Sequence, residues 1–108
     1  MKIKTIDVDG LEWWDKVNGN HYFAAIVTIN YGMKSEKKLL LPFQYGYGEQ
    51  YTYQAMAKLI EQKFIIDAVK YPSGGNEPLW TYCERKNIIL RRVKHTGCKK
   101  AELKNIEL

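Results

Sequence analysis

The chain passes from a strand-like run to a helix-like run through Pro42-Phe43-Gln44-Tyr45-Gly46-Tyr47-Gly48-Glu49-Gln50-Tyr51-Thr52-Tyr53. This joint combines five aromatic residues with two glycines. Glycine allows the backbone to take a positive φ or to approach another surface closely. Aromatic side chains beside such a joint either pack a helix onto a sheet or present a stacking surface. We therefore expect the joint to fix the local fold and to locate the functional site.

The aromatic side chains of the joint admit two interpretations. In the first, Phe43, Tyr47 and Tyr51 are core residues that hold the strand against the helix. In the second, Tyr45, Tyr47 and Tyr53 are exposed and stack on bases or fill a pocket of a partner. Alternation along a strand predicts that Tyr45 and Tyr47 share one side, so both are buried or both are exposed.

Three residues of the joint are predicted to be structural: Gly46, Gly48 and Tyr51. At least one of the glycines should have a positive φ or pack against a neighbouring backbone. Tyr51 lies in the first turn of the expected helix, so its ring should cover the end of the strand near Phe43.

Hydrophobic periodicity extends the interpretation outward from the joint and predicts an α+β fold with a single antiparallel sheet of three to four strands. The sheet packs against two helices, and a short helix or tail ends the chain.

Within the strand before the joint, Leu39, Leu41 and Phe43 share a face. The Asn18-Gly19 pair predicts a tight hairpin turn. The expected strands cover residues 2–8 with 11–14 as a continuation or plug, 21–31, 38–44 and 88–94, and the expected helices cover 49–63, 78–87 and 99–108.

Length and composition indicate one domain, residues 1–108, with enough apolar side chains for a core. No apolar run approaches ~18 residues, and no apolar segment follows Met1-Lys2-Ile3-Lys4, so neither a membrane span nor a signal peptide is expected. We therefore expect a cytoplasmic protein with reduced thiols at Cys83 and Cys98.

The net charge of +5 lies entirely in the second half of the sequence. Residues 1–54 carry six Lys and Arg against six Asp and Glu, whereas residues 55–108 carry eleven against six. A basic cluster attracts phosphates or an acidic partner, or it forms a solvated face. The cluster comprises Arg85, Lys86, Arg91, Arg92, Lys94, Lys99, Lys100 and Lys104.

Motifs for catalysis are absent from the sequence. Gly46-Tyr47-Gly48 begins like a dinucleotide-binding fingerprint, but Tyr51 occupies the position of its third glycine. His21 and His95 are isolated, and Cys83 and Cys98 do not have the spacing of metal ligands. We therefore expect a protein that is not an enzyme and has no cofactor, metal site or catalytic residue.

The joint also carries a resemblance to a known group of proteins. The run from Tyr45 to Tyr51, with the entry Asn18-Gly19-Asn20-His21-Tyr22 and the basic segment from Cys98 to Lys104, resembles small, mostly uncharacterised accessory proteins of tailed bacteriophages and prophages. The resemblance covers residues 13–64 and 88–104. It implies a viral accessory protein of the bacterial host cell, and such proteins often serve counter-defence.

Two hypotheses of function follow. The first is a binding protein that inhibits a host defence protein or nucleoprotein complex, as anti-CRISPR proteins do. The second is direct binding of DNA or RNA, with sequestration of an anionic nucleotide signal as a variant. Adjacent tryptophans in a strand point to opposite faces, so one of the Trp13–Trp14 pair should be exposed. The expected contact residues are Trp13, Trp14, Tyr45, Tyr47, Tyr53, Arg91, Arg92 and Lys94.

Overall fold

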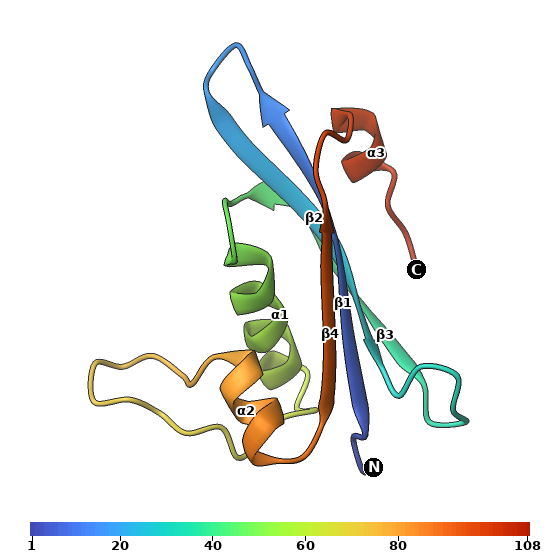
Figure 1. Ribbon diagram of the computed structural model, residues 1–108, viewed down its shortest axis with the longest axis vertical. Helices are drawn as coiled ribbons and strands as arrows, with labels where there is room; N and C mark the ends of the chain where they lie inside the picture. Colours follow the sequence, from blue (N-terminus) through green and yellow to red (C-terminus); the bar gives the residue numbers. More distant parts are fainter.

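The computed structural model describes residues 1–108 and contains one four-stranded sheet and three helices (Figure 1). The order of elements along the chain is the order that the hydrophobic periodicity predicts. Residues 11–14 continue the first strand. The elements are β1 (Thr5–Asp15), β2 (Asn20–Ile29), β3 (Lys37–Tyr45), α1 (Gln50–Glu61), α2 (Leu79–Arg85), β4 (Ile89–His95) and α3 (Lys100–Lys104).

The sheet is mixed, in strand order β3-β2-β1-β4, so the prediction of a purely antiparallel sheet is wrong. β1, β2 and β3 form an antiparallel meander, and β4 pairs in parallel with β1. A hairpin can join only antiparallel neighbours, but a long helical connection can return the chain in parallel. Residues 46–88 form such a connection through α1 and α2.

The hairpin between β1 and β2 turns at residues 16–19, a four-residue turn that contains the predicted Asn-Gly pair. Gly19 has φ of +70°. The Asp15 carboxylate accepts hydrogen bonds from the backbone N–H of Val17 and from both the backbone and the side chain of Asn18. These bonds lower the pKa of Asp15.

The main core lies between the sheet and the pair α1 and α2, which cover one face (Figure 1). Alternate residues of the strands point into it, as expected from their period of two. The strands contribute Ile6, Val8, Phe23, Ala25, Val27, Ile29 and Leu41, and the helices contribute Tyr51, Ala55, Met56, Leu59, Leu79, Tyr82 and Cys83.

A β-bulge changes the face of Phe43, so the prediction that Phe43 shares a face with Leu39 and Leu41 is wrong. The register of β2 and β3 shifts between Phe23 and Ala25. The extra residue reverses the alternation beyond Leu41. The Phe43 ring therefore stacks on Tyr22, on the face opposite α1, with ring centroids 5.0 Å apart.

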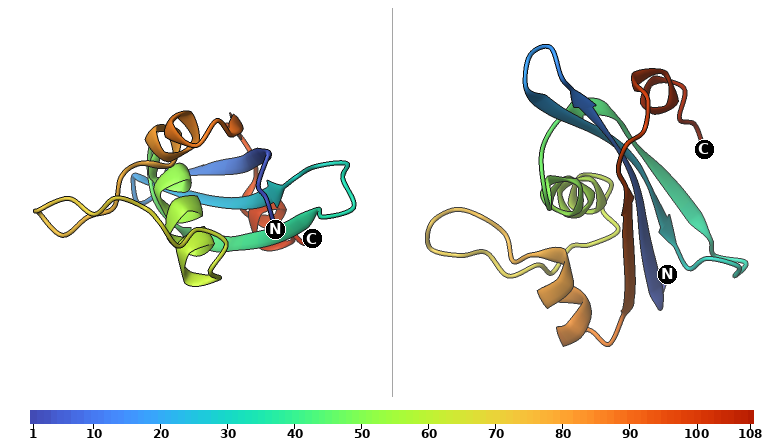
Figure 2. Two further views of the ribbon diagram at one scale, coloured as in Figure 1. Left: turned by 90° about the horizontal axis from the view of Figure 1, so that it is seen from below. Right: turned by 45° about the horizontal axis from the view of Figure 1, so that its top comes forward.

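The second face of the sheet is covered at one end by α3, which lies across the sheet from α1 (Figure 2). Leu103 of α3 is fully buried outside the main core. Beside it lies a row of aromatic rings in which Trp13 stacks on Tyr22 and Tyr22 stacks on Phe43. The ammonium groups of Lys100 and Lys104 lie over the rings of Trp13 and Phe43. This small second core explains why the outer face of β2 is apolar.

The two glycines of the joint have different structural roles. Gly48 has φ of +63°, which confirms the prediction of a positive φ. Gly46 is buried, and an added Cβ would overlap the ring of Phe23. Tyr51 is buried as a structural residue, but its ring packs on Gly10 of β1 rather than near Phe43. The prediction for the position of the Tyr51 ring is wrong because Phe43 faces the other way.

Candidate functional site

The predicted contact residues divide between the two faces of the sheet. Trp14, Tyr47, Tyr53, Arg92 and Lys94 lie on the face that carries α1 and α2. Trp13, Tyr45 and Arg91 lie on the opposite face. Tyr45 packs edge-on against Tyr22, whereas Tyr47 packs against His21, so the two tyrosines do not share a side as predicted. Both are nonetheless well exposed, at 67% and 71%.

On the first face, His21 lies between two exposed aromatic rings. Its ring centroid is 4.5 Å from that of Trp14 and 4.9 Å from that of Tyr47. β1 and β2 place Trp14 and His21 directly opposite each other in the ladder, and the glycine joint places Tyr47 over them. His21 is isolated in the sequence because its aromatic partners, Trp14 and Tyr47, come from two other segments.

Beneath these rings lies a nearly buried ion pair. Glu12 is 8% exposed, and its Oε2 lies 2.8 Å from Nζ of Lys94. The other carboxylate oxygen, Oε1, is 3.3 Å from Nδ1 of His21. The Lys94 ammonium also donates to the carbonyl oxygen of Gly48 at 2.9 Å. Lys94 thus connects β1, β4 and the joint, and Glu12 is a site residue that the sequence pattern did not reveal.

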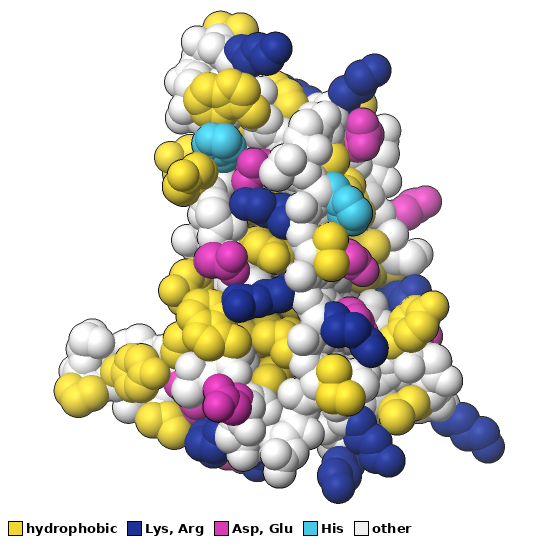
Figure 3. All heavy atoms as spheres, viewed as in Figure 1, with side chains coloured by type: hydrophobic (Ala, Val, Ile, Leu, Met, Phe, Trp, Pro, Cys, Tyr) yellow, Lys and Arg dark blue, Asp and Glu magenta, His cyan; other side chains and the backbone are white.

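A second group of aromatic rings lies farther along the same face. Tyr53 of α1 and Trp80 of α2 pack edge to face with centroids 5.6 Å apart. The Arg92 guanidinium carbon lies 4.8 Å from the centre of the Trp80 ring. The same guanidinium is 3.1 Å from the Glu49 carboxylate. Hydrophobic and charged side chains therefore alternate along this face (Figure 3).

We call this surface the aromatic face. It joins the predicted residues Trp14, Tyr47, Tyr53, Arg92 and Lys94 with three that were not predicted, Glu12, His21 and Trp80. The neighbours of Trp80 are established only by the docking of α2 against α1. The cations of the face lie beside carboxylates, so the face presents aromatic rings around internally compensated charges.

The basic cluster of the second half is largely neutralised in the fold. Arg91, Arg92 and Lys94 pair with Asp7, Glu49 and Glu12, which come from the first half of the sequence. Arg85 and Lys86 pair with Glu77 and Asp67. The position of charge along the sequence therefore does not give its distribution on the surface.

The opposite face places Arg91 in a different setting. Its guanidinium makes a two-point contact with the Asp7 carboxylate, at 2.6 Å and 3.0 Å, and this bond raises the pKa of Arg91. The pair lies in an open depression of about 460 Å³, lined also by Asp9, Tyr31 and Lys38.

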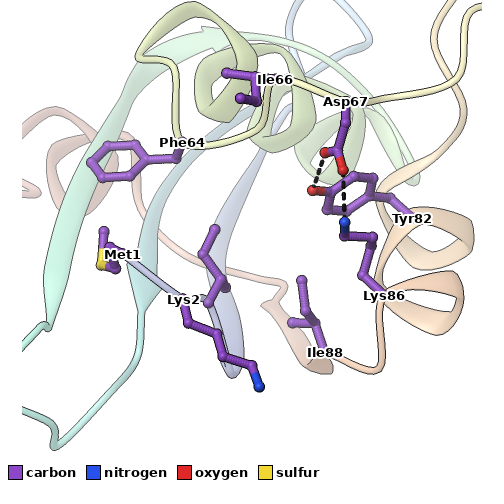
Figure 4. Close-up of a pocket in the computed structure, with 9 residues that line it drawn as sticks. Met1, Lys2, Phe64, Ile66, Asp67, Tyr82, Lys86 and Ile88 are labelled. Carbon is purple, nitrogen blue, oxygen red and sulfur yellow. Dashed lines mark hydrogen bonds and ion pairs between the residues drawn. The ribbon is translucent and has the colours of Figure 1, made fainter.

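A second cavity, of about 440 Å³, lies between α2, the N-terminal residues and the segment after α1 (Figure 4). Its apolar wall includes Ile3, Phe64 and Ile88. At its polar end, Asp67 accepts hydrogen bonds of 2.6 Å from the Tyr82 hydroxyl and from the Lys86 ammonium. These bonds lower the pKa of Asp67 to about 2. The two donors are thereby engaged within the protein.

The remaining nucleophilic and metal-ligating groups do not assemble into a centre. Cys83 is buried, and desolvation raises the pKa of its thiol to about 11. Cys98 donates from Sγ to the carbonyl oxygen of His95 at 3.3 Å. No three side chains of His, Cys, Asp or Glu come together in a geometry that could hold a metal ion.

The chain matches no protein family model, and no similar curated protein or solved structure is found. None of its three helices has the length and the apolar character needed to cross a membrane.

Proposed function

We propose that this protein is a non-enzymatic binding protein that docks onto a partner protein through the aromatic face. Trp, Tyr and Arg are the residue types that contribute most to protein–protein binding energy. The aromatic face brings all three together from distant segments and leaves Trp14, Tyr47 and Tyr53 at least 42% exposed. This concentration of exposed rings on one face is the observation that carries the proposal.

The compensated charges of the face favour a protein partner over a polyanion. Lys and Arg side chains bind a nucleic acid by displacing the counterions from its phosphates, which requires cations that no carboxylate of the protein already engages. Arg92 and Lys94 instead lie against Glu49 and Glu12, and a phosphate would also meet those carboxylates. Exposed aromatic rings surrounded by polar groups that already have partners are typical of a surface that becomes the centre of a protein interface.

The resemblance to phage accessory proteins identifies the class of partner to test. A host defence complex, such as a CRISPR effector, is the target that the resemblance implies. Inhibition would then result from occupation of a functional surface of that complex rather than from chemistry on it.

The proposal is tested with purified defence complexes and two matched variants. Tyr47→Ala combined with Tyr53→Ala removes two exposed rings of the aromatic face. Tyr71→Ala removes an exposed tyrosine from the loop before α2 and is the control. We expect the native protein and Tyr71→Ala to bind one complex and inhibit its target cleavage. The double variant should lose at least about tenfold in affinity with an unchanged melting temperature.

Failure of the native protein to bind or inhibit any complex at low salt would reject the defence-complex partner. Equal affinity of the double variant and the native protein for a bound complex would reject the aromatic face as the docking surface.

A further inference from the structure

Five lysines that sequence reasoning left unassigned gather at one end of the sheet. Lys2 and Lys4 precede β1, Lys34 lies in the loop after β2, and Lys37 and Lys38 begin β3. All five are exposed, and none forms an ion pair or donates a side-chain hydrogen bond. We call this group the basic end. It lies where the N-terminus meets the loop between β2 and β3 (Figure 1), and Lys and Arg side chains crowd that end in Figure 3.

The basic end arises because acids and cations pair across the two halves of the chain. Asp7, Glu12 and Glu49 of the first half are engaged by Arg91, Lys94 and Arg92 of the second. Those pairs leave the five lysines without a paired carboxylate, and Asp9, an acid of the first half that forms no ion pair, lines the depression beside Tyr31 and Lys38. The only acid in the neighbouring loop, Glu36, accepts a hydrogen bond from the backbone N–H of Gly32.

A buried asparagine holds the two lysine-bearing segments together. Asn30 is 0% exposed and has φ of 53°. Its Oδ1 accepts from the backbone N–H of Lys4 at 2.7 Å, and its Nδ2 donates to the carbonyl oxygen of Lys2 at 2.9 Å and to Oγ of Ser35 at 3.0 Å. The backbones that carry the five lysines are therefore fixed relative to one another before any ligand arrives.

We propose that the basic end binds single-stranded nucleic acid, with the lysines on its phosphates and Tyr31 stacked on a base. Tyr31 follows Asn30 directly and is 65% exposed. A cationic groove with an aromatic ring is how proteins bind single strands without reading their sequence. Unpaired lysines give the counterion release that phosphate binding requires.

The arrangement of the lysines favours a flexible strand over a flat anionic surface. Lys37 pairs with Ile29 and Lys38 with Thr28, so the two side chains lie on opposite faces of the sheet. A bilayer can contact only one of these faces at a time. A single strand can bend around the end of the sheet and contact both.

Fluorescence anisotropy with labelled ~20-nucleotide oligo(dT) and oligo(U) tests the proposal. The native protein should bind at about 50 mM salt and lose about 100-fold in affinity at about 200 mM, the value for five phosphate contacts on a single strand. Lys34→Gln, Lys37→Gln and Lys38→Gln together should reduce the log–log salt slope by about 2. Tyr31→Ala should weaken binding at least about fivefold. Comparison of the two oligonucleotides distinguishes DNA from RNA.

A control of equal charge separates a local site from a general effect of net charge. Lys16→Gln, Lys70→Gln and Lys99→Gln remove three lysines that also form no ion pair but lie away from the basic end. This control should retain the native salt slope. Equal weakening in both triple variants would overturn the proposal, as would no binding at about 50 mM salt. Binding to phosphatidylserine vesicles or poly-glutamate but not to the oligonucleotides would also overturn it.

Discussion

The glycines of the joint show how two identical residues in one motif face different constraints. At Gly46 a Cβ would overlap the Phe23 ring, whereas at Gly48 nothing lies within 4 Å of the Cβ position and only φ of +63° opposes substitution. We expect Gly46→Ala to lower the free energy of unfolding by about 3 kcal/mol through overpacking. Gly48→Ala should lower it by about 1 kcal/mol, and Gly48→Asn by less because Asn tolerates positive φ. Urea denaturation measures all three, and a larger loss for Gly48→Ala than for Gly46→Ala would contradict this assignment.

The contact between Tyr51 of α1 and Gly10 of β1 provides a second prediction about packing at the joint. A Cβ at Gly10 would lie 3.0 Å from Cδ2 of Tyr51, so the glycine makes room for the ring. Tyr51→Ala should destabilise the fold by about 3 kcal/mol through the cavity that it leaves. Gly10→Ala should destabilise the native protein but cost less in the Tyr51→Ala background, because the ring that it meets is gone. Additive effects in a double-mutant cycle would show that the two residues do not contact each other.

At the scale of elements, the sequence contained enough information for the order of strands and helices but not for their pairing. The alternation in β2, the Asn-Gly turn and the helical spacing of Ala55, Met56 and Leu59 are local signals, and each predicted its element. The bulge opposite Ala24 and the parallel pairing of β4 depend on contacts between distant segments. One inserted residue moved Phe43 across the sheet, so the predicted contact of the Tyr51 ring with Phe43 failed. Tyr45 and Tyr47 do not share a side because β3 ends at Tyr45 and the chain leaves the strand before Tyr47. The aromatic face was therefore predicted in part, and its His21, Glu12 and Trp80 members required the tertiary fold.

The short helix α3 provides a prediction at the same scale. A five-residue helix has little stability of its own, so its docking depends on the buried Leu103. Leu103→Ala should release α3 and the end of the chain, while α1 and the main core keep their protection. Hydrogen exchange should then show faster exchange in residues 100–106, with slow exchange retained in β2. Loss of protection across the whole sheet would show instead that the second core is part of the same cooperative unit.

At the scale of the whole molecule, ion pairs tie the loop before α2 to the rest of the fold and make stability depend on pH. The pKa of Asp67 is lowered to about 2 by the hydrogen bond from Lys86 and then by that from Tyr82, and Arg85 lowers that of Glu77. A carboxylate with a lowered pKa stabilises the fold above its unfolded pKa, and this stabilisation is lost as the pH falls toward the folded value. We expect the melting temperature to fall between about pH 5 and about pH 2. Asp67→Asn should lower the melting temperature at neutral pH and reduce its fall between about pH 5 and about pH 2. The control is Asp9→Asn, which removes an exposed carboxylate that forms no ion pair and should leave the pH dependence of the melting temperature unchanged.

The Glu12–Lys94 pair joins the two halves of the chain. A double-mutant cycle can show whether the ion pair makes the fold more stable than a neutral pair would, or whether each charge only compensates the other. Lys94→Met leaves the Glu12 carboxylate, 8% exposed, without its ammonium, and should cost at least about 2 kcal/mol. Glu12→Gln should cost a similar amount, because it leaves the ammonium without a carboxylate and with the Gly48 carbonyl as its remaining charge-neutral hydrogen-bond partner. The double variant Glu12→Gln, Lys94→Met should recover much of the loss, since no unpaired charge remains. Urea denaturation at neutral pH measures the cycle. If each single change costs little, the pair is solvated in solution, and the joint is held by Tyr51 and Gly46 rather than by Lys94.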